Sequence, residues 1–346
     1  MTTIADISAE EIARTAKETG FSGVVSLAPL RTGPSLDLMF GLADRANRIP
    51  NNAGTRFAMA SGCKIFTAIA VGLLIEEGRI ALDTRLADCV RSREFHFAPE
   101  ITIGQLLNHT SGVPDYFGEE AQSDYAALWR ERPCYGMTST RDFLPLFENG
   151  AMKAPPGSGF LYSNSGFILL GLVVEELTGR DFRDFVADRV FRACGMMRSG
   201  YFAMDALPEN TAYGYLSQAE NEWRTNIFSV PSIGGPDGGA FTTAGDMRLF
   251  WTSLLAGRVL SRETIDRFVA PSVRVMDGDD SLHYGYGVWL RKQRGNWIVS
   301  VEGGDPGASM ESLVWLSDGL IVTVLSNTED GAWTVARTLI EKINAG

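Results

Sequence analysis

Strand-forming and helix-forming patterns are segregated along this chain of 346 residues. Alternating apolar patterns typical of strands occur near both ends, whereas helical periodicity dominates the middle. This order predicts an α+β fold in which both chain ends contribute to one antiparallel sheet. The predicted segments are a helix over 7–19, strands over 22–28, 36–42 and 56–60, helices over 61–77, 101–107, 140–148, 165–177 and 182–191, strands over 284–290, 297–301, 309–316 and 320–326, and a closing helix over 333–343.

The same order predicts how the chain divides into domains. Residues 1–80 and 226–346 are expected to form an α/β sheet domain, and residues 81–225 an inserted, mostly helical domain. The active site is expected between the two. No internal repeat and no low-complexity linker interrupts this pattern.

Charge and composition exclude several classes of protein. Lys+Arg is 31 and Asp+Glu is 42, which gives a net charge of −11 and argues against nucleic acid as a partner. Hydrophobic residues make up 45% of the chain, so a disordered protein is excluded. Only five of the positive residues are lysines, namely Lys17, Lys64, Lys153, Lys292 and Lys342.

The four cysteines are isolated in the sequence, so neither a zinc site nor a disulfide framework is expected. No cofactor is predicted either. The longest apolar run, 65–75, is too short to span a bilayer, which needs about 20 residues. The first residues lack a basic segment followed by an apolar one, so a cytoplasmic location is predicted. The sequence does not indicate an oligomeric state.

One short motif, Ser61-Gly-Cys-Lys64, places a hydroxyl and an amine three residues apart at a predicted helix start. Residues i and i+3 share a helix face, so the amine is within reach of the hydroxyl. Serine needs a neighbour to take its proton before it is a good nucleophile. A buried lysine can do so because burial disfavours its charged form. The alternative is a capping serine followed by a surface lysine, but the next residues are apolar on every face, which favours burial of Lys64.

A second motif, Tyr162-Ser163-Asn164, contains the only Tyr-x-Asn in the chain. It lies in a Pro- and Gly-rich segment directly before the helix predicted over 165–177. Taken alone, it is equally explained as a loop tyrosine followed by an asparagine that caps the helix.

Together these motifs resemble the serine β-lactamase and penicillin-binding-protein superfamily, and in particular its class C β-lactamase-like branch. That resemblance implies a β-lactamase/transpeptidase-like fold and covers most of the chain. The branch includes D-alanyl-D-alanine carboxypeptidases, D-aminopeptidases and carboxylesterases. The matching segments are Phe57-Ala-Met-Ala-Ser-Gly-Cys-Lys-Ile-Phe-Thr, Ile80-Ala-Leu-Asp, Ile101-Thr-Ile-Gly-Gln-Leu-Leu-Asn-His-Thr-Ser-Gly-Val, Tyr162-Ser-Asn-Ser-Gly-Phe, Gly238-Gly-Ala-Phe-Thr-Thr-Ala-Gly-Asp-Met, Tyr284-Gly-Tyr-Gly-Val-Trp and Gly303-Gly-Asp-Pro-Gly.

The resemblance also implies a role for each matching residue. Ser61 is the acyl-accepting nucleophile, and Lys64 and Tyr162 share the proton transfers. Asn164 resembles the family residue that hydrogen-bonds both the lysine and the substrate. The oxyanion hole combines the backbone N–H of Ser61 with that of Gly304.

The third family motif is where this sequence departs from the pattern. The family usually has Lys- or His-x-Gly, whereas this chain has Val301-Glu302-Gly303. Strand alternation sends Val301 and Glu302 to opposite faces, and we expect Val301 to occupy the Lys/His position. Either register removes a positive group, so a substrate carboxylate is disfavoured unless an arginine elsewhere holds it. A neutral ester, or a substrate with a free amine, fits better.

Other candidate residues are assigned structural roles. His109 is expected to hold a turn, because no Gly-x-Ser-x-Gly elbow is present for a serine–histidine pair. Cys63 is expected to pack rather than react. The aromatic segment 114–135 is expected either to line an acyl pocket or lid or to pack between domains. The acidic segment 277–280 lacks the rest of a calcium loop and reads as a solvated turn.

These observations predict a serine hydrolase that acts through an acyl-enzyme on Ser61, with a small-molecule ester or amide as substrate. An esterase of small or medium acyl esters is the first hypothesis. An amide hydrolase is the second, either a D-aminopeptidase, a D-alanyl-D-alanine carboxypeptidase or a weak β-lactamase, and in the first case Glu302 would pair with a substrate ammonium. A non-catalytic relative that binds a ligand is the third.

Overall fold

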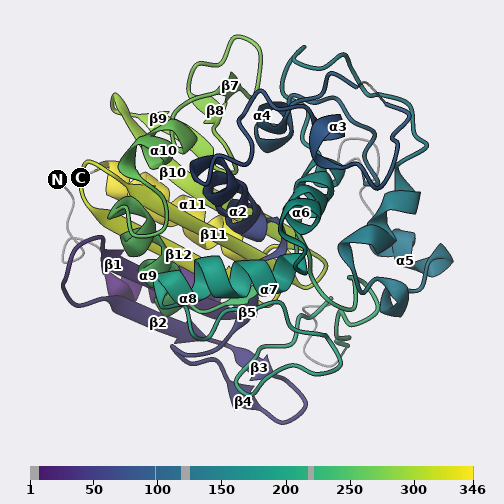
Figure 1. The fold of residues 1–346 in the computed structure, drawn as a ribbon. Helices are drawn as coiled ribbons and strands as arrows, with labels where there is room; N and C mark the ends of the chain where they lie inside the picture. Colours follow the sequence, from purple (N-terminus) through teal and green to yellow (C-terminus); the bar gives the residue numbers. More distant parts are fainter. Residues whose placement is uncertain (1–7, 98, 118–124, 217–221, 346) are drawn as a thin grey trace.

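A computed structural model describes residues 8–97, 99–117, 125–216 and 222–345. Within these residues the centre is an antiparallel sheet of eight strands in the order β2-β1-β12-β11-β10-β9-β8-β7 (Figure 1). Because β1 pairs with β12, the two ends of the chain share one sheet, which confirms the predicted α+β class. The strands are β1 Gly23–Pro29, β2 Leu36–Phe40, β7 Val273–Arg274, β8 Leu282–Tyr284, β9 Trp289–Gln293, β10 Asn296–Asp305, β11 Ala308–Trp315 and β12 Leu320–Ser326.

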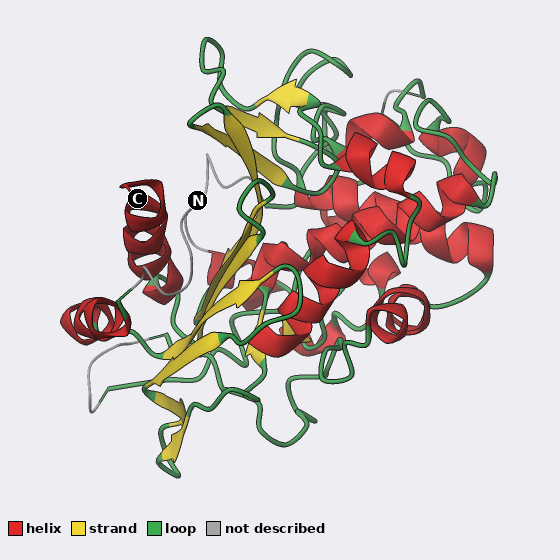
Figure 2. Cartoon of the chain, turned by 90° about the vertical axis from the view of Figure 1, so that its left-hand side faces the viewer, coloured by secondary structure: helices red, strands yellow, loops and turns green. Residues whose placement is uncertain are grey.

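Two terminal helices cover the outer face of the sheet, α1 Ala9–Thr19 and α11 Gly331–Ala345 (Figure 2). Ser8 caps α1 by accepting the backbone N–H of Glu11, and Gly20 ends it in the left-handed conformation at φ 65°. The apolar side chains of both helices pack with those of β1, β11 and β12 in one cluster, which includes Ile12, Val25 and Val335. These helices pack on the side of the sheet opposite α2.

The inner face of the sheet packs against the remaining helices (Figure 2). Among them α2 Lys64–Glu76 and α6 Asn164–Thr178 are buried along most of their length, as their continuous apolar sequences predict. The other helices are α3 Leu86–Cys89, α4 Ile103–Leu107, α5 Leu128–Glu131, α7 Phe182–Val186, α8 Arg192–Cys194, α9 Ala244–Leu255 and α10 Arg262–Phe268.

Short elements complete the fold and position the site. Two strand pairs lie outside the main sheet, β3 Leu42–Asp44 with β4 Ile49–Pro50 and β5 Phe57–Ala58 with β6 Phe241–Thr242. Tight helical turns are 3-10 at Ala60–Cys63, Tyr125–Ala127, Cys134–Gly136 and Thr140–Leu146, and π at Ala187–Phe191.

The structure corrects several of the predicted segments. The helix predicted over 140–148 is a 3-10 helix, and the second half of the one predicted over 182–191 is a π-helix. The strand predicted over 284–290 is instead the end of β8 and the start of β9, because Gly285 and Gly287 lie in the turn between them and Gly287 has a φ of 82°. The helix predicted over 61–77 begins later, since Ser61 lies in the 3-10 turn before α2. The domain boundaries at 80 and 225 stay a prediction. In the described part of the chain, every helix is too short or too polar to cross a membrane.

Candidate active site

Ser61 is held in a strained turn between β5 and α2. The preceding residue, Ala60, has a φ of 46°, which is left-handed and costs a residue with a Cβ about 1–2 kcal/mol. Two backbone bonds fix this turn: Met59 N–H to Ala240 O at 2.7 Å and Gly239 N–H to Ala60 O at 3.2 Å. The position of Ser61 therefore depends on a segment that is distant in sequence.

Lys64 is 2% exposed, which confirms the burial expected from the apolar sequence of α2. Its Nζ lies 2.8 Å from Ser61 Oγ, 2.8 Å from Asn164 Oδ1 and 2.7 Å from Asp237 O. The last two oxygens can only accept hydrogen bonds. Nζ therefore donates to these two oxygens, which hold it beside Ser61 Oγ. This geometry makes Lys64 able to accept the serine proton.

Tyr162 is half-buried beside the amine, with its ring centre 4.9 Å from Lys64 Nζ. Its ring stacks on Trp289 with centroids 6.2 Å apart, and it also contacts the ring of His109 with centroids 4.4 Å apart. The structure thus brings Ser61, Lys64 and Tyr162 into one cluster, although they come from two distant parts of the chain.

Asn164 lies at the first position of α6 and is 5% exposed. Its backbone N–H donates to Asp115 Oδ2 at 3.1 Å, and the next N–H, of Ser165, donates to Asp115 Oδ1 at 2.9 Å. A carboxylate at a helix N-terminus stabilises the free N–H groups there. The pKa of Asp115 is raised nonetheless, chiefly by burial. Sequence reasoning missed this positioning role of Asp115, because no pattern in the sequence links residues 115 and 164.

The third motif lies on β10, directly beside the nucleophile turn. Val301 is 2% exposed and packs in the core shared with α2, whereas Glu302 points to the other face and pairs with Arg291. A Cβ added to Gly303 would lie 2.2 Å from Met59 O and 2.7 Å from Ser61 N. Only glycine therefore lets β10 approach the turn so closely.

The edge of β10 is open next to this contact. Its pairing with β9 runs from Asn296 to Ser300, and among the described residues no strand continues that pairing to Asp305. Gly304 is exposed on this stretch. A substrate backbone can lie along such an edge, because unpaired backbone groups of a strand accept a further extended chain.

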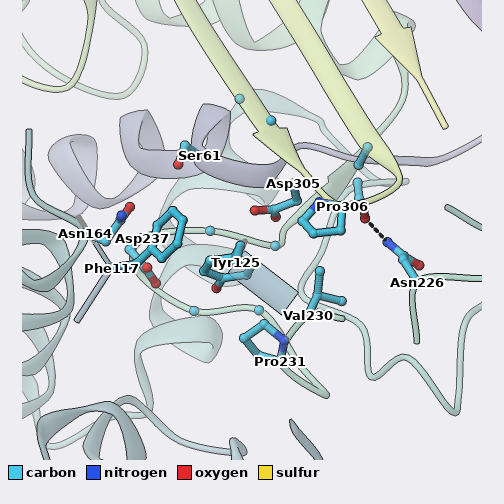
Figure 3. Close-up of a pocket in the computed structure, with 18 of the residues that line it drawn as sticks. Ser61, Phe117, Tyr125, Asn164, Asn226, Val230, Pro231, Asp237, Asp305 and Pro306 are labelled. Carbon is cyan, nitrogen blue, oxygen red and sulfur yellow. Dashed lines mark hydrogen bonds between the residues drawn. The ribbon is translucent and has the colours of Figure 1, made fainter. Parts of the chain in front are cut away.

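A cavity of about 530 Å³ opens at this edge (Figure 3). Ser61, Tyr162, Asn164, Glu302, Gly303 and Gly304 all line it. Its lining contains five acidic residues and, within the described chain, no lysine or arginine. The acidic residues are buried Asp237, half-buried Glu302 and Asp305, and exposed Glu329 and Asp330.

Asp237 has two functions at the back of the cavity. Its carbonyl accepts the Lys64 amine, and its carboxylate accepts the hydroxyl of Tyr116. Burial raises the pKa of Asp237, and the nearby Lys64 opposes that shift. The pKa of Tyr116 is raised as well, first by burial and then by the Asp237 charge. Sequence reasoning missed Asp237, which is separated from Lys64 by 173 residues.

The aromatic segment 114–135 divides between the two roles predicted for it. Tyr116, Phe117 and Tyr125 line the cavity. Trp129 is buried behind them, in contact with Tyr125 at a centroid distance of 5.5 Å. Tyr135 is 75% exposed. Residues 118–124 lie outside the described residues.

His109 and Cys63 have the structural roles expected of them. His109 is fully buried and accepts the backbone N–H of Ser163 at Nδ1 over 3.1 Å, and burial lowers its pKa well below the usual value. Cys63 is buried with its Sγ 3.9 Å from Gly235 O, and burial raises the pKa of this thiol to about 12. A thiol that stays protonated is unreactive.

Two further acidic or metal-ligating arrangements were considered in the sequence. No group of three or more His, Cys, Asp or Glu side chains there is arranged to hold a metal ion. The acidic segment 277–280 is a turn in which Asp280 pairs with Arg274 at 3.1 Å and Asp279 accepts the N–H of Ser281.

Comparison with known proteins identifies the class to which this site belongs. The profile of the family described as Beta-lactamase matches residues 9–345. The chain therefore belongs to the Beta-lactamase family of serine hydrolases.

Three relatives are particularly informative. A crystal structure of a penicillin-binding protein from Bacillus halodurans is 42% identical, with a TM-score of 0.90 over 95% of this chain and 99% of that one. Penicillin-binding protein 4* of Bacillus subtilis is 28% identical over 84% of this chain and 65% of its own length. A D-aminopeptidase of Cereibacter sphaeroides is 26% identical over 87% of this chain and 56% of its own length. This chain thus spans less than two thirds of the length of these two sequence relatives.

Proposed function

We propose that this protein hydrolyses carboxylic amides and esters whose acyl part carries a protonated amine, through an acyl-enzyme on Ser61. The observation that supports this most directly is the cavity beside Ser61, which has five acidic and no basic residues in the described lining. A cluster of carboxylates attracts a cation and repels an anion. An acyl group with an ammonium next to the scissile carbonyl is the matching substrate.

Acylation begins with Ser61. Its Oγ attacks the carbonyl carbon while its proton passes to Nζ of Lys64, 2.8 Å away. Asn164 and the carbonyl of Asp237 keep that amine oriented. The backbone N–H groups of Ser61 and Gly304 stabilise the oxyanion. The C–N or C–O bond then breaks, and the leaving group takes the proton from the Lys64 and Tyr162 pair.

Deacylation repeats the steps with water. The water oxygen attacks the ester carbonyl of the acyl-enzyme, and its proton passes to the same pair. The bond to Ser61 Oγ breaks, the oxygen regains a proton, and the free acid leaves. Each residue thus returns to its starting protonation state.

The acyl group is expected on the side of the cavity opposite Tyr162, because Tyr162 must reach the leaving group. Tyr125, Asp305 and Val230 line the cavity on the side away from Asn164 (Figure 3), and we expect the acyl group there. The half-buried carboxylate of Asp305 is the acceptor expected for the ammonium there. The similarity to a D-aminopeptidase supports the same substrate class.

An esterase of neutral acyl groups is the second candidate. It was the first hypothesis from the sequence, and the buried apolar side chain of Val301 favours it. Both candidates use the same catalytic residues, so they differ only in the acyl group. A D-alanyl-D-alanine carboxypeptidase or β-lactamase fits less well, because both substrates bring a carboxylate into an acidic cavity. The predicted cytoplasmic location stays a prediction.

A panel of paired substrates tests this proposal. D-Alanine p-nitroanilide is compared with its N-acetyl derivative, and p-nitrophenyl butyrate and nitrocefin complete the panel. We expect kcat/KM for the free amine to exceed that for the acetylated form by at least about tenfold. Asp305→Asn should reduce this ratio. Ser61→Ala should abolish all turnover, whereas Ser317→Ala, in an exposed turn, serves as the matched control.

Three outcomes would contradict the proposal, each in a different way. Equal turnover of the free and acetylated anilides would show that the acidic cavity does not select for a protonated amine. Turnover of p-nitrophenyl butyrate alone favours the neutral esterase. No labelling of Ser61 by a fluorophosphonate probe favours the non-catalytic relative.

A further inference from the structure

The outer face of β10 and β11 places two carboxylates opposite each other beside the cavity. Glu302 and Glu311 are direct cross-strand partners in the β10–β11 register. Strand alternation puts them on the face covered by α11, together with buried Leu313 and Trp315. Glu302 lines the cavity, while Glu311 is 5% exposed and does not reach it.

An arginine lies beside this pair. Arg291 on β9 contacts Glu302 with its Nη2 3.3 Å from Oε2. In the described structure Oε1 of Glu311 is buried without a hydrogen bond. Like charges directly opposite each other destabilise a sheet. Packing alone therefore does not explain why two carboxylates face each other here. A role of Glu302 in binding substrate at the cavity would explain it.

The pair lies on the leaving-group side of the site. Trp289 stacks on Tyr162 and is the cross-strand partner of Ser300. Ser300 and Glu302 are two residues apart on β10, so their side chains lie on the same face of the sheet. In the mechanism proposed above, Tyr162 and Lys64 return the proton to the leaving group. A leaving group that Tyr162 can reach therefore also faces Glu302.

We infer that Glu302, backed by Glu311, is a specificity-determining residue for the leaving group, admitting neutral or cationic amines and rejecting those that carry a carboxylate beside the scissile bond. This inference rests on the proposed function. Its reason is charge: Glu302 lines the cavity whereas Arg291 is not among the lining residues, so a substrate carboxylate meets another carboxylate here.

Glu311 makes this selection depend on pH. Burial, reinforced by the Glu302 charge, raises the pKa of Glu311 to about 7. The charged groups that act on it are Glu302 and Arg291, while β12 places Val324 opposite it and α11 covers this face with apolar residues such as Val335. Loss of the Glu311 proton as pH rises adds a negative charge to the pair. Rejection of a carboxylate should therefore strengthen as pH rises through 7.

The test uses two dipeptides that differ only in that carboxylate, D-alanyl-D-alanine and D-alanyl-D-alaninamide. We expect the native enzyme to release D-alaninamide at least about ten times more efficiently than D-alanine at pH 8. Glu302→Gln should reduce this ratio severalfold by improving turnover of the acid. Glu311→Gln should reduce it at pH 8 and leave it unchanged at pH 5.5. Glu341→Gln, on the exposed side of α11, is the matched control and should leave the ratio at the native value.

A second pair of substrates separates this inference from the proposed function. The 3-carboxyphenyl and 3-carbamoylphenyl esters of phenylacetic acid have a neutral acyl group and leaving groups that differ in charge. If only these esters are hydrolysed, the amine preference is wrong, but the same dependence on Glu302 would still support the inference. A ratio that Glu302→Gln leaves unchanged in both pairs would overturn it.

Discussion

On its inner face β10 presents Val301 and Gly303 to the nucleophile turn, and on its outer face it presents Glu302 opposite Glu311. The inner face is packed so closely that a single methyl group at Gly303 would collide with the backbone of Met59. Its neighbouring amine, Lys64, has three hydrogen-bond partners. The outer face instead holds two acids with one arginine.

This difference shows that one strand carries two kinds of constraint. Inside, close packing and complete hydrogen bonding fix the reacting atoms within fractions of an ångström, as catalysis requires. Outside, an arrangement that weakens the fold is retained. Substitutions on the inner face should therefore lower activity. Substitutions on the outer face should instead change the stability of the protein and its dependence on pH.

The largest effect is expected where the inner face is broken. Lys64→Met keeps the length of the side chain and removes the amine, so Ser61 has no base and kcat/KM should fall by on the order of 10²–10⁴. Initial rates with the best substrate of the panel, together with the rate of fluorophosphonate labelling, measure this loss. Labelling at the native rate would show that another group activates Ser61.

Gly303→Ala should have the next largest effect. The new Cβ forces β10 away from Ser61 N, and a misplacement of about 1 Å costs on the order of 10²-fold in rate. The matched control is Gly304→Ala, whose Cβ would meet only Trp333 at 3.2 Å. The loss of kcat/KM should be clearly smaller for Gly304→Ala than for Gly303→Ala. Equal losses would show that close packing at Gly303 does not position Ser61.

Glu311→Gln should stabilise the protein at high pH. The folded-state pKa of Glu311 is about 7, against an ordinary value of 4.5. Between these values the native state binds the extra proton, so its stability falls as pH rises. Removing the carboxyl should therefore raise the free energy of unfolding by up to about 3 kcal/mol at pH 8 and by much less at pH 5.

Urea unfolding of the native protein, Glu311→Gln and Glu341→Gln at both pH values measures this gain. A gain that is the same at pH 5 and pH 8 would show that charge is not its cause.

The smallest effect is expected at Cys63. The folded protein should resist iodoacetamide at pH 8, because this thiol is buried and its pKa is raised to about 12. Mass spectrometry of the peptide that contains Cys63 should show modification only after unfolding in urea. Rapid modification of the native protein would mean that the inner face opens in solution.

The sequence predicted those parts of the site that depend on local pattern. The continuous apolar residues after Lys64 predicted its burial, and the spacing from Ser61 predicted their contact. Strand alternation predicted that Val301 and Glu302 lie on opposite faces. In each case the signal lies within a few residues of the group concerned.

Contacts between distant segments could not be predicted in this way. Asp115 and Asp237 reach Asn164 and Lys64 across 49 and 173 residues, and no pattern in the sequence links them. Glu311 could have been noticed from the local sequence, because every second residue after it, Leu313 and Trp315, is buried on the same face of the strand. An acid at such a position is expected to be buried, which marks it as unusual.

The open edge of β10 has one more consequence. Exposed strand edges are sites where protein chains aggregate by adding strand to strand. Here the unpaired stretch after Ser300 is short, it contains two glycines, and it ends at Asp305 and Pro306. A charge and a proline both oppose continued pairing, because one repels and the other lacks an N–H. The edge is therefore long enough for a small substrate but too short to template the growth of a fibril.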